Sequence, residues 1–366
     1  MKNNMAPNQE QESGVVTGHF FIFYAFDVGD DIALSKIETA QPIAIKQFTL
    51  SKYFKNYQIP LAVELPEPST SPNCSSVTIH SFGVISLVYK IPFTDTFETL
   101  KTTINSIDAV YREQSMADAH AVFTKIKPYI KQSKFFHLRN SYLMIQVDQN
   151  PHLGLMDLKQ NYGSSIASLL HFETEWLSEY QKDAILESAT GYYRGDLVII
   201  DTYAAFVYDE DYVEILDLFE FANIQQLELH YYDRILDHQL NVVYQQEVWT
   251  LPLTAYIPFI SNLTKDPIGD LYRLRVEISV IIERIENSIK TAGDAYISET
   301  YSLLEEKLDL KNLKNSLDNK LAIIKDVLSV YQSKIDTTRE DLLSVLIILL
   351  ILIEVFIGLA SYHKSK

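Results

Sequence analysis

The feature that most constrains this chain is an apolar run near its C-terminal end, from Leu342 to Ala360. The run is about 19 residues long, and roughly 20 apolar residues suffice for a helix to cross a bilayer. Glu354 is the only charged residue in it, whereas a core helix of this length in a soluble protein would show a polar face. The run therefore predicts one transmembrane helix over 342–360, followed by a short polar tail over 361–366.

Glu354 lies close to the middle of the predicted span, where a glutamate is too short to reach the membrane surface. A central acidic residue costs roughly 2.5–3.5 kcal/mol on insertion scales, and the apolar neighbours outweigh that cost. Two interpretations remain open: the side chain contacts another helix and helps to specify an oligomer, or it is a tolerated charge with local water. We expect the oligomer contact, because ionisable groups inside membranes usually face protein.

The charge of the chain limits its partners. A formal net charge of -17 repels phosphate backbones, so direct nucleic-acid binding is not expected. Cys74 is the only cysteine, which excludes an internal disulfide and suits a reducing compartment. Residues 1–15 show no secretory signal and are expected to be a disordered tail. We therefore expect a tail-anchored protein of a bacterial inner membrane, with the bulk of the chain on the cytoplasmic side.

Between residues 16 and 265, strand-like and helix-like patterns alternate, which predicts a mixed α/β soluble domain of the α+β class. If this domain has two lobes, we expect the break near 150–195. The stretch 197–208 fits either a tight hairpin or one bent strand. The predicted strands are HFFIFYAFDV from His19, Val77–Ile91 and Phe135–Val147, and the predicted helices are Phe97–Lys131 with a split near Glu113, Gly163–Ala189 and Tyr212–Gln246.

A proline-marked connector precedes a second type of pattern over 266–341. Apolar residues recur there at spacings of three, four and seven in two stretches, which predicts two coiled-coil-like helices folded back on each other near Leu308. We interpret one apolar face as the seam of a homo-oligomer. Its residues are Leu274, Ile278, Ile281 and Ile285.

A candidate for chemistry is the helix predicted over 212–246. Asp233 and Asp237 lie four residues apart and could share a cation, so a metal-dependent hydrolase that uses them with Asp201 is the alternative function. The other interpretation is a solvated helix face braced by Arg234. The sequence contains no phosphate-binding glycine loop and no nucleophile elbow. We therefore expect no catalytic residues, no metal and no cofactor.

The order of features from Leu197 to Leu359 resembles the "required for meiotic nuclear division" family of bacterial, fungal and mitochondrial proteins. The segments that carry the resemblance are LVIIDTYAAFVYD, EFANIQQLELHYYDRILDHQL, ERIENSIKTAGDAYISETY, LKNLKNSLDNKLAIIKDVLSVYQ and LIILLILIEVFIGL. The resemblance implies an inner-membrane anchor, self-association into large complexes and, in mitochondria, a supporting role in translation near the membrane. Together with the residues, it predicts a non-enzymatic, homo-oligomeric scaffold or tether that organises an unknown protein partner at the membrane.

Overall fold

The computed structural model places a mixed sheet domain before a set of long helices, which confirms the predicted α+β class. The described residues are 14–47, 59–67, 71–135, 139–151, 153–191, 193, 195–245, 267–288 and 295–364. Their strands are β1 (Val15–Asp27), β2 (Asp31–Ile32), β3 (Leu61–Ala62), β4 (Cys74–His80), β5 (Val84–Thr96), β6 (Ile130–Lys131), β7 (Arg139–Val147), β8 (Leu197–Ile200) and β9 (Ala204–Tyr208). Their helices are α1 (Leu34–Ala40), α2 (Phe97–Ile126), the 3-10 helix η1 (Lys127–Tyr129), α3 (Leu155–Asn161), α4 (Gly163–Leu170), α5 (Glu179–Glu187), α6 (Val213–Gln245), α7 (Pro267–Ser288), α8 (Ala295–Lys307) and α9 (Leu310–Lys364).

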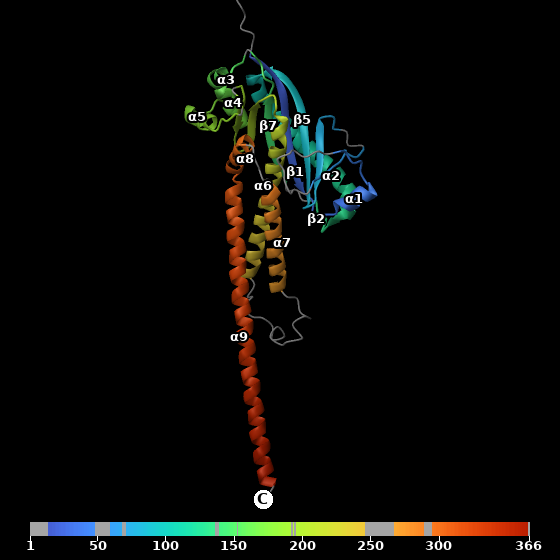
Figure 1. The fold of residues 1–366 in the computed structure, drawn as a ribbon, viewed down its shortest axis with the longest axis vertical. Helices are drawn as coiled ribbons and strands as arrows, with labels where there is room; N and C mark the ends of the chain where they lie inside the picture. Colours follow the sequence, from blue (N-terminus) through green and yellow to red (C-terminus); the bar gives the residue numbers. More distant parts are fainter. Residues whose placement is uncertain are drawn as a thin grey trace, which may run out of the picture. The chain divides into compact units, whose positions relative to one another are not determined.

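One sheet organises the domain, with strand order β3-β4-β5-β1-β7-β9-β8 (Figure 1). Neighbouring strands are antiparallel except β7 and β9, which run parallel. The long strand β1 lies at the centre and pairs with β5 along its whole length and with β7 from Gly18 to Phe26. The predicted alternative of a tight hairpin over 197–208 is confirmed, because β8 and β9 pair antiparallel.

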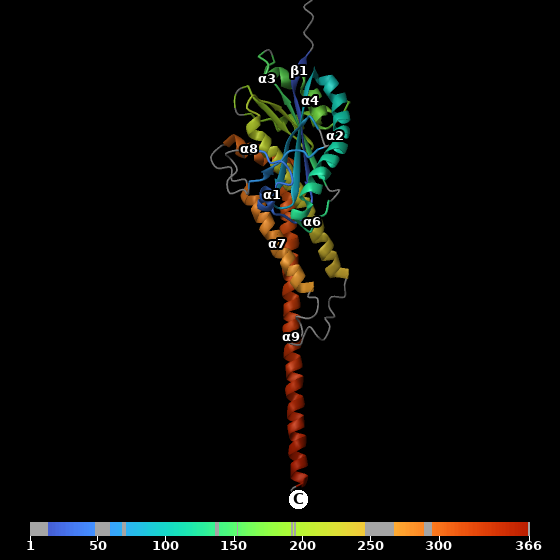
Figure 2. The same cartoon turned by 90° about the vertical axis from the view of Figure 1, so that its right-hand side faces the viewer.

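Both faces of β1 are covered, which explains why its sequence is a continuous apolar run rather than an alternating one. Phe20, Ile22 and Tyr24 belong to a core cluster that includes side chains of α2 and α4, and Figure 2 shows α2 alongside the sheet. On the opposite face, Phe23 stacks on Phe219 of α6 with ring centroids 6.3 Å apart. Burying one such phenylalanine is worth about 1.5–3 kcal/mol.

The predicted single strand Val77–Ile91 is wrong, because a tight turn divides it into β4 and β5. Gly83 occupies that turn with a φ of 107°, a conformation that side-chain-bearing residues rarely adopt. A Cβ atom at this position would lie 1.7 Å from the carbonyl oxygen of Gly29. The close approach of the two loop backbones therefore requires glycine, and the turn has no proline or second glycine that would have marked it in the sequence.

Two predicted helix boundaries also need correction. Helix α2 is continuous from Phe97 to Ile126, so the predicted split near Glu113 is wrong. The predicted helix Gly163–Ala189 is two helices, α4 and α5. Phe172 follows α4 with a φ of 58°, and this left-handed residue ends the helix. The single helix predicted over 212–246 is confirmed as α6.

The chain divides into two compact units, Met1–His230 with Glu283–Leu313, and Tyr231–Ile282 with Lys314–Lys366. The first unit contains the sheet. In the second unit, buried apolar side chains recur at helical spacings on α6, α7 and α9, as the two amphipathic stretches predict. These side chains are Leu236, Leu240, Leu271, Ile278, Ile282, Leu317, Leu321, Ile324 and Tyr331.

Candidate functional site

Asp201, one of the three carboxylates of the predicted hydrolase, follows β8 in the first unit. Its side chain is buried, and its Oδ2 lies 2.6 Å from Nε2 of His171. The two groups are in close contact without the alignment of a hydrogen bond. Nζ of Lys307 lies 3.6 Å from Oδ1, and the Tyr142 hydroxyl donates to the Asp201 carbonyl oxygen at 2.7 Å. Asp201 is therefore neutralised by side chains from α8 and from the end of α4.

Asp233 and Asp237 lie together in the second unit, but a lysine already stands between them. Nζ of Lys320 is 2.7 Å from Oδ1 of Asp233 and 2.6 Å from Oδ1 of Asp237. Burial lowers the pKa of Lys320, and the hydrogen bonds to the two carboxylates outweigh burial, so its pKa is raised. The Ser316 hydroxyl also donates to Asp233 at 3.0 Å. The ammonium group thus occupies the position that a shared metal ion would take.

Across the described residues, no group of three or more histidine, cysteine, aspartate or glutamate side chains has a geometry that could hold a metal ion. The metal-dependent hydrolase stays a prediction without a supporting contact. Neither His171 nor Lys320 was a candidate partner from the sequence, because each lies far along the chain from the carboxylate that it neutralises. Only the fold brings these pairs together.

The predicted oligomer seam lies on α7. Ile278 is completely buried within the single chain and Leu274 is half-buried, while the side chains of Ile281 and Ile285 lie outside the described residues. A side chain that its own chain already covers has little surface left for a second copy. Among the described side chains of α7, Tyr272, Val276 and Val280 are apolar and exposed. A seam between copies stays a prediction.

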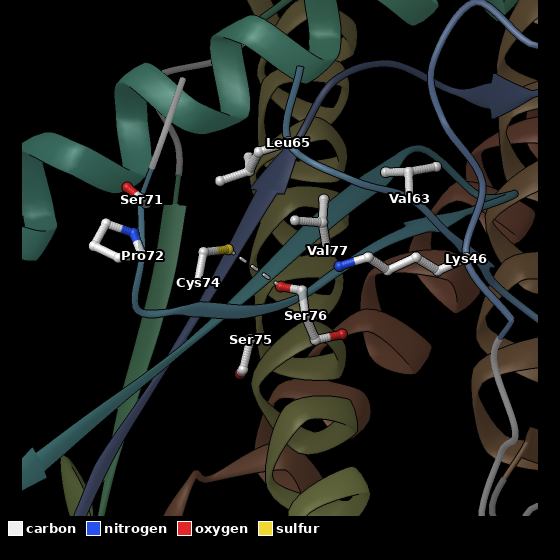
Figure 3. Close-up of a pocket in the computed structure, with 9 residues that line it drawn as sticks. All are labelled: Lys46, Val63, Leu65, Ser71, Pro72, Cys74, Ser75, Ser76 and Val77. Atoms are coloured by element: carbon white, nitrogen blue, oxygen red, sulfur yellow. Dashed lines mark hydrogen bonds between the residues drawn. The ribbon is translucent and has the colours of Figure 1, made fainter. Parts of the chain in front are cut away.

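A cavity of about 460 Å³ surrounds the only cysteine at the start of β4 (Figure 3). Burial, followed by the nearby charge of Asp118, raises the pKa of the Cys74 thiol to about 12. The buried Asp118 itself accepts hydrogen bonds from Tyr89 at 2.7 Å and from Ser71 at 2.8 Å. A thiol that stays protonated is a poor nucleophile and a poor metal ligand. The geometry therefore supports a structural role for Cys74.

Asp27 and Glu228 are buried acidic side chains, and a third acid, Glu220 of α6, is half-buried. Burial raises the pKa of Asp27 to about 7, and burial, together with the charges of Asp27 and Asp30, raises the pKa of Glu228 well above its usual range. Glu220 accepts a hydrogen bond from Thr78 at 2.9 Å, and burial raises its pKa as well. The sequence analysis missed these residues. They could have been noticed as acids at the end of an apolar strand or among the apolar residues of a helix.

The C-terminal part of α9 carries the predicted span. The segment Leu310–Ser361 has a mean hydropathy of 3.1 in its most apolar stretch, and none of that stretch is buried in the chain. Ile348 is 57% exposed and Phe356 is 76% exposed. Glu354 lies in the same exposed stretch and in the same helix. The helix is long and apolar enough to be a single-pass membrane anchor, and its length does not fix which side the domain faces.

Comparison with known proteins identifies the first half of the chain. Residues 17–214 match the family described as the N-terminal domain of the uncharacterized protein MJ0711. The uncharacterized protein MJ0711 of Methanocaldococcus jannaschii is 27% identical over 206 residues, which cover 56% of this chain and 61% of that protein. The match thus spans less than two thirds of the relative. No solved structure matches the chain.

The matched region is the sheet domain, whereas the predicted resemblance to the "required for meiotic nuclear division" family rests on residues 197–359. The two regions overlap only at the β8–β9 hairpin, so the match does not bear on that second resemblance, which stays a prediction. Because residues 17–214 make up more than half of the chain, the chain belongs to the family of the N-terminal domain of the uncharacterized protein MJ0711.

Proposed function

We propose that this chain is a membrane-anchored, non-enzymatic scaffold that self-associates and holds a protein partner at the membrane. The observation that carries the proposal is the bare apolar helix over 342–360, whose side chains its own chain leaves exposed. At about 25 cal/mol for each Å² of apolar surface, the exposure of such a helix to water is strongly unfavourable. A bilayer core covers a helix of this length on all sides.

Self-association is the second part of the proposal, and it rests on Glu354. A carboxyl group near the middle of a bilayer is stabilised best by a polar group of another helix. A second copy of this chain offers the same carboxyl group at the same depth, and a protonated carboxyl can both donate and accept a hydrogen bond. The resemblance to the "required for meiotic nuclear division" family, which implies self-association into large complexes, also supports this part of the proposal.

The sheet domain is the part of the scaffold that would hold a partner, and we place it on the cytoplasmic side. Protease added to inverted membrane vesicles should then digest the domain while the span stays intact. Protection of the domain in inverted vesicles, with digestion in cells stripped of their wall, would show the opposite orientation.

The anchor is tested by making its centre unfavourable to lipid. Leu349→Arg with Leu352→Arg adds two central charges, each costing roughly 2.5–3.5 kcal/mol on insertion scales. The parent chain should float with lipid in a density gradient after an alkaline wash, and the double variant should not. Val330→Arg, an exposed position in the same helix before the span, is the matched control and should float like the parent. A parent chain that stays in the dense fractions, or a double variant that floats, rejects the anchor.

A further inference from the structure

The first unit contains a second pocket, of about 370 Å³, between α2 and the sheet. Ile22, Ile104 and Leu143 give it an apolar floor, while Arg112 from α2 and His171 from the end of α4 stand at its wall. An apolar pocket of this size with a few converging polar groups is the usual form of a small-molecule site. No short motif in the sequence predicts this pocket, because its residues come from five separate segments: β1, α2, β7, the end of α4 and the β8–β9 turn.

Arg112 and Asp108 carry opposite charges at the lining of this pocket, and a second arginine, Arg139, lies beside Arg112. Nη2 of Arg112 lies 2.7 Å from Oδ2 of Asp108, and Nη1 of Arg139 donates to the Arg112 carbonyl oxygen at 3.0 Å. Both guanidinium groups also act on the buried Tyr24 hydroxyl, whose pKa is raised by burial and then by Asp108 and is lowered by the two arginines. Two guanidinium groups therefore meet one carboxylate here.

A second carboxylate lies next to the His171 side of the pocket. His171 lines the pocket and contacts Asp201, whose other oxygen faces Lys307. Asp108 thus pairs with Arg112 at the pocket, while Asp201 and Lys307 are not among its lining residues. The Arg112 guanidinium has more N–H donors than the one that faces Asp108, and it would attract an anion to the pocket.

An independent observation is the backbone at the pocket wall. Phe172 lines the pocket and has a φ of 58°, which is uncommon for a residue with a side chain. Nδ2 of Asn105, another pocket residue, donates to the Phe172 carbonyl oxygen at 3.2 Å. This conformation ends α4, since the Glu173 amide donates to the Ser168 carbonyl oxygen at 2.9 Å, so the pocket wall is a fixed helix end bound to α2.

We propose that this pocket binds a small organic anion, a carboxylate or phosphate monoester that carries an apolar body. The body would lie on the apolar floor, and the anionic group would be held by the Arg112 guanidinium, which binds planar carboxylate and phosphate oxygens through two parallel hydrogen bonds. Binding at this pocket goes beyond anchoring and does not depend on it, so either proposal can fail without the other.

The test uses the full chain in detergent and titrates three probes of similar size by calorimetry: phenyl phosphate, benzoate and the neutral benzamide. We expect saturable binding of at least one anion, with benzamide at least about tenfold weaker, which corresponds to about 1.4 kcal/mol. Inorganic phosphate, which lacks the apolar body, should also bind at least about tenfold more weakly than phenyl phosphate. Equal affinity for benzamide and the anions, or no saturation by either anion, overturns the proposal.

Two variants locate the binding. Arg112→Gln should weaken anion binding at least about tenfold, and Lys125→Gln, an exposed change of the same charge on the same helix, should leave it unchanged. Ile107→Trp fills the pocket without changing the charge and should also abolish binding, while thermal unfolding confirms that both pocket variants are folded. Anion affinity that falls equally in Arg112→Gln and Lys125→Gln, or that survives Ile107→Trp, places the site elsewhere and overturns the proposal.

Discussion

The two halves of helix α9 belong to one continuous helix and meet different surroundings. Before the span, buried apolar side chains alternate with charged ones, and Leu317 and Ile324 are covered by their own chain. From Leu342 onwards the apolar residues occupy every side of the helix, and all of them are exposed. The first half has one apolar face, which its own chain covers, and the second half is apolar on all sides and is not covered by any of the described residues.

The comparison shows how the pattern of apolar residues indicates what will cover them. A stripe at spacings of three and four leaves a polar face for water, so a helix of the same chain can cover the rest. A helix that is apolar all round has no face for water and must be surrounded by lipid or by other proteins. The two glutamates differ in the same way. Glu228 is buried within its own domain, whereas Glu354 is exposed on the apolar half of α9.

The largest loss of stability is expected on the buried apolar face of α9 before the span. Ile324→Asp places a charge at a fully buried position and should lower the free energy of unfolding by about 3–5 kcal/mol. Ile323→Asp, one residue earlier and 40% exposed, should cost less than about 1 kcal/mol. Chemical denaturation in detergent measures both values.

The dependence on protein concentration sharpens this test. If the cover of Ile324 comes from the same chain, the loss of stability should not change over a hundredfold range of protein concentration. A loss that disappears at high concentration would show that a second copy covers the stripe. The predicted seam on α7 would then be an interface between copies after all.

A smaller effect is expected from the acids that the sheet domain encloses. The pKa of Asp27 is raised from 3.8 to about 7, and each unit corresponds to about 1.36 kcal/mol. Because the folded state binds the proton more tightly than the unfolded state, stability is full below about pH 4, falls as the pH rises towards 7, and is constant above it. At pH 8 the shift of about three units corresponds to an expected loss of at most about 4 kcal/mol.

Asp27→Asn should remove the part of this pH dependence that is due to Asp27, while the part due to Glu228 and Glu220 remains. The variant keeps an oxygen that can accept the hydrogen bond from the Gly29 amide, so it should be more stable than the parent at pH 8 and no more stable at pH 4. Asp31→Asn, an exposed position nearby, is the control. Unfolding free energies that vary with pH alike in the parent and Asp27→Asn would show that Asp27 is not the titrating group.

Substitution of Glu354, in the exposed apolar half of α9, should change the free energy of assembly by a still smaller amount for each copy. Glu354→Leu removes an interhelical hydrogen bond worth roughly 0.6–2 kcal/mol, while Glu354→Gln retains the ability to form one. We expect Glu354→Leu to stay in the membrane and migrate as a smaller or more heterogeneous complex on native gels, and Glu354→Gln to migrate like the parent. Identical sizes for all three proteins favour the tolerated charge.

How far the sequence predicted the molecule depends on whether a feature is local. The fold class, α6 and the apolar helix were predicted from the patterns of apolar residues along the chain, and the β8–β9 hairpin was one of two predicted alternatives. The β4–β5 turn was missed, because the need for Gly83 arises from the distant Gly29 backbone. The break after α4 was missed for a related reason, since it depends on one left-handed residue, Phe172.

The same limit applies to the sites. Asp201, Asp233 and Asp237 were identifiable as carboxylates in suggestive positions, but whether a metal or a lysine neutralises them depends on contacts between distant segments. Lys320 lies about 85 residues from its partners along the chain. The pocket at Arg112 joins five segments of the chain, so no short motif could have indicated it.

The smallest effect is expected at Lys320, whose ammonium group lies between Asp233 and Asp237, where the alternative function would place a metal ion. Lys320→Met leaves Asp233 and Asp237 without their shared cation and should lower the unfolding free energy by at most about 1 kcal/mol, because Asp237 is half exposed and water screens the pair. Lys325→Met, an exposed lysine of the same helix, should have no measurable effect. Magnesium chloride should restore the stability of Lys320→Met and leave the parent unchanged, because only the variant has a vacant place between the two carboxylates. A parent chain that purifies with a bound metal, and loses it in Asp233→Ala with Asp237→Ala, would instead show that the lysine gives way to a metal and would favour the hydrolase over the scaffold.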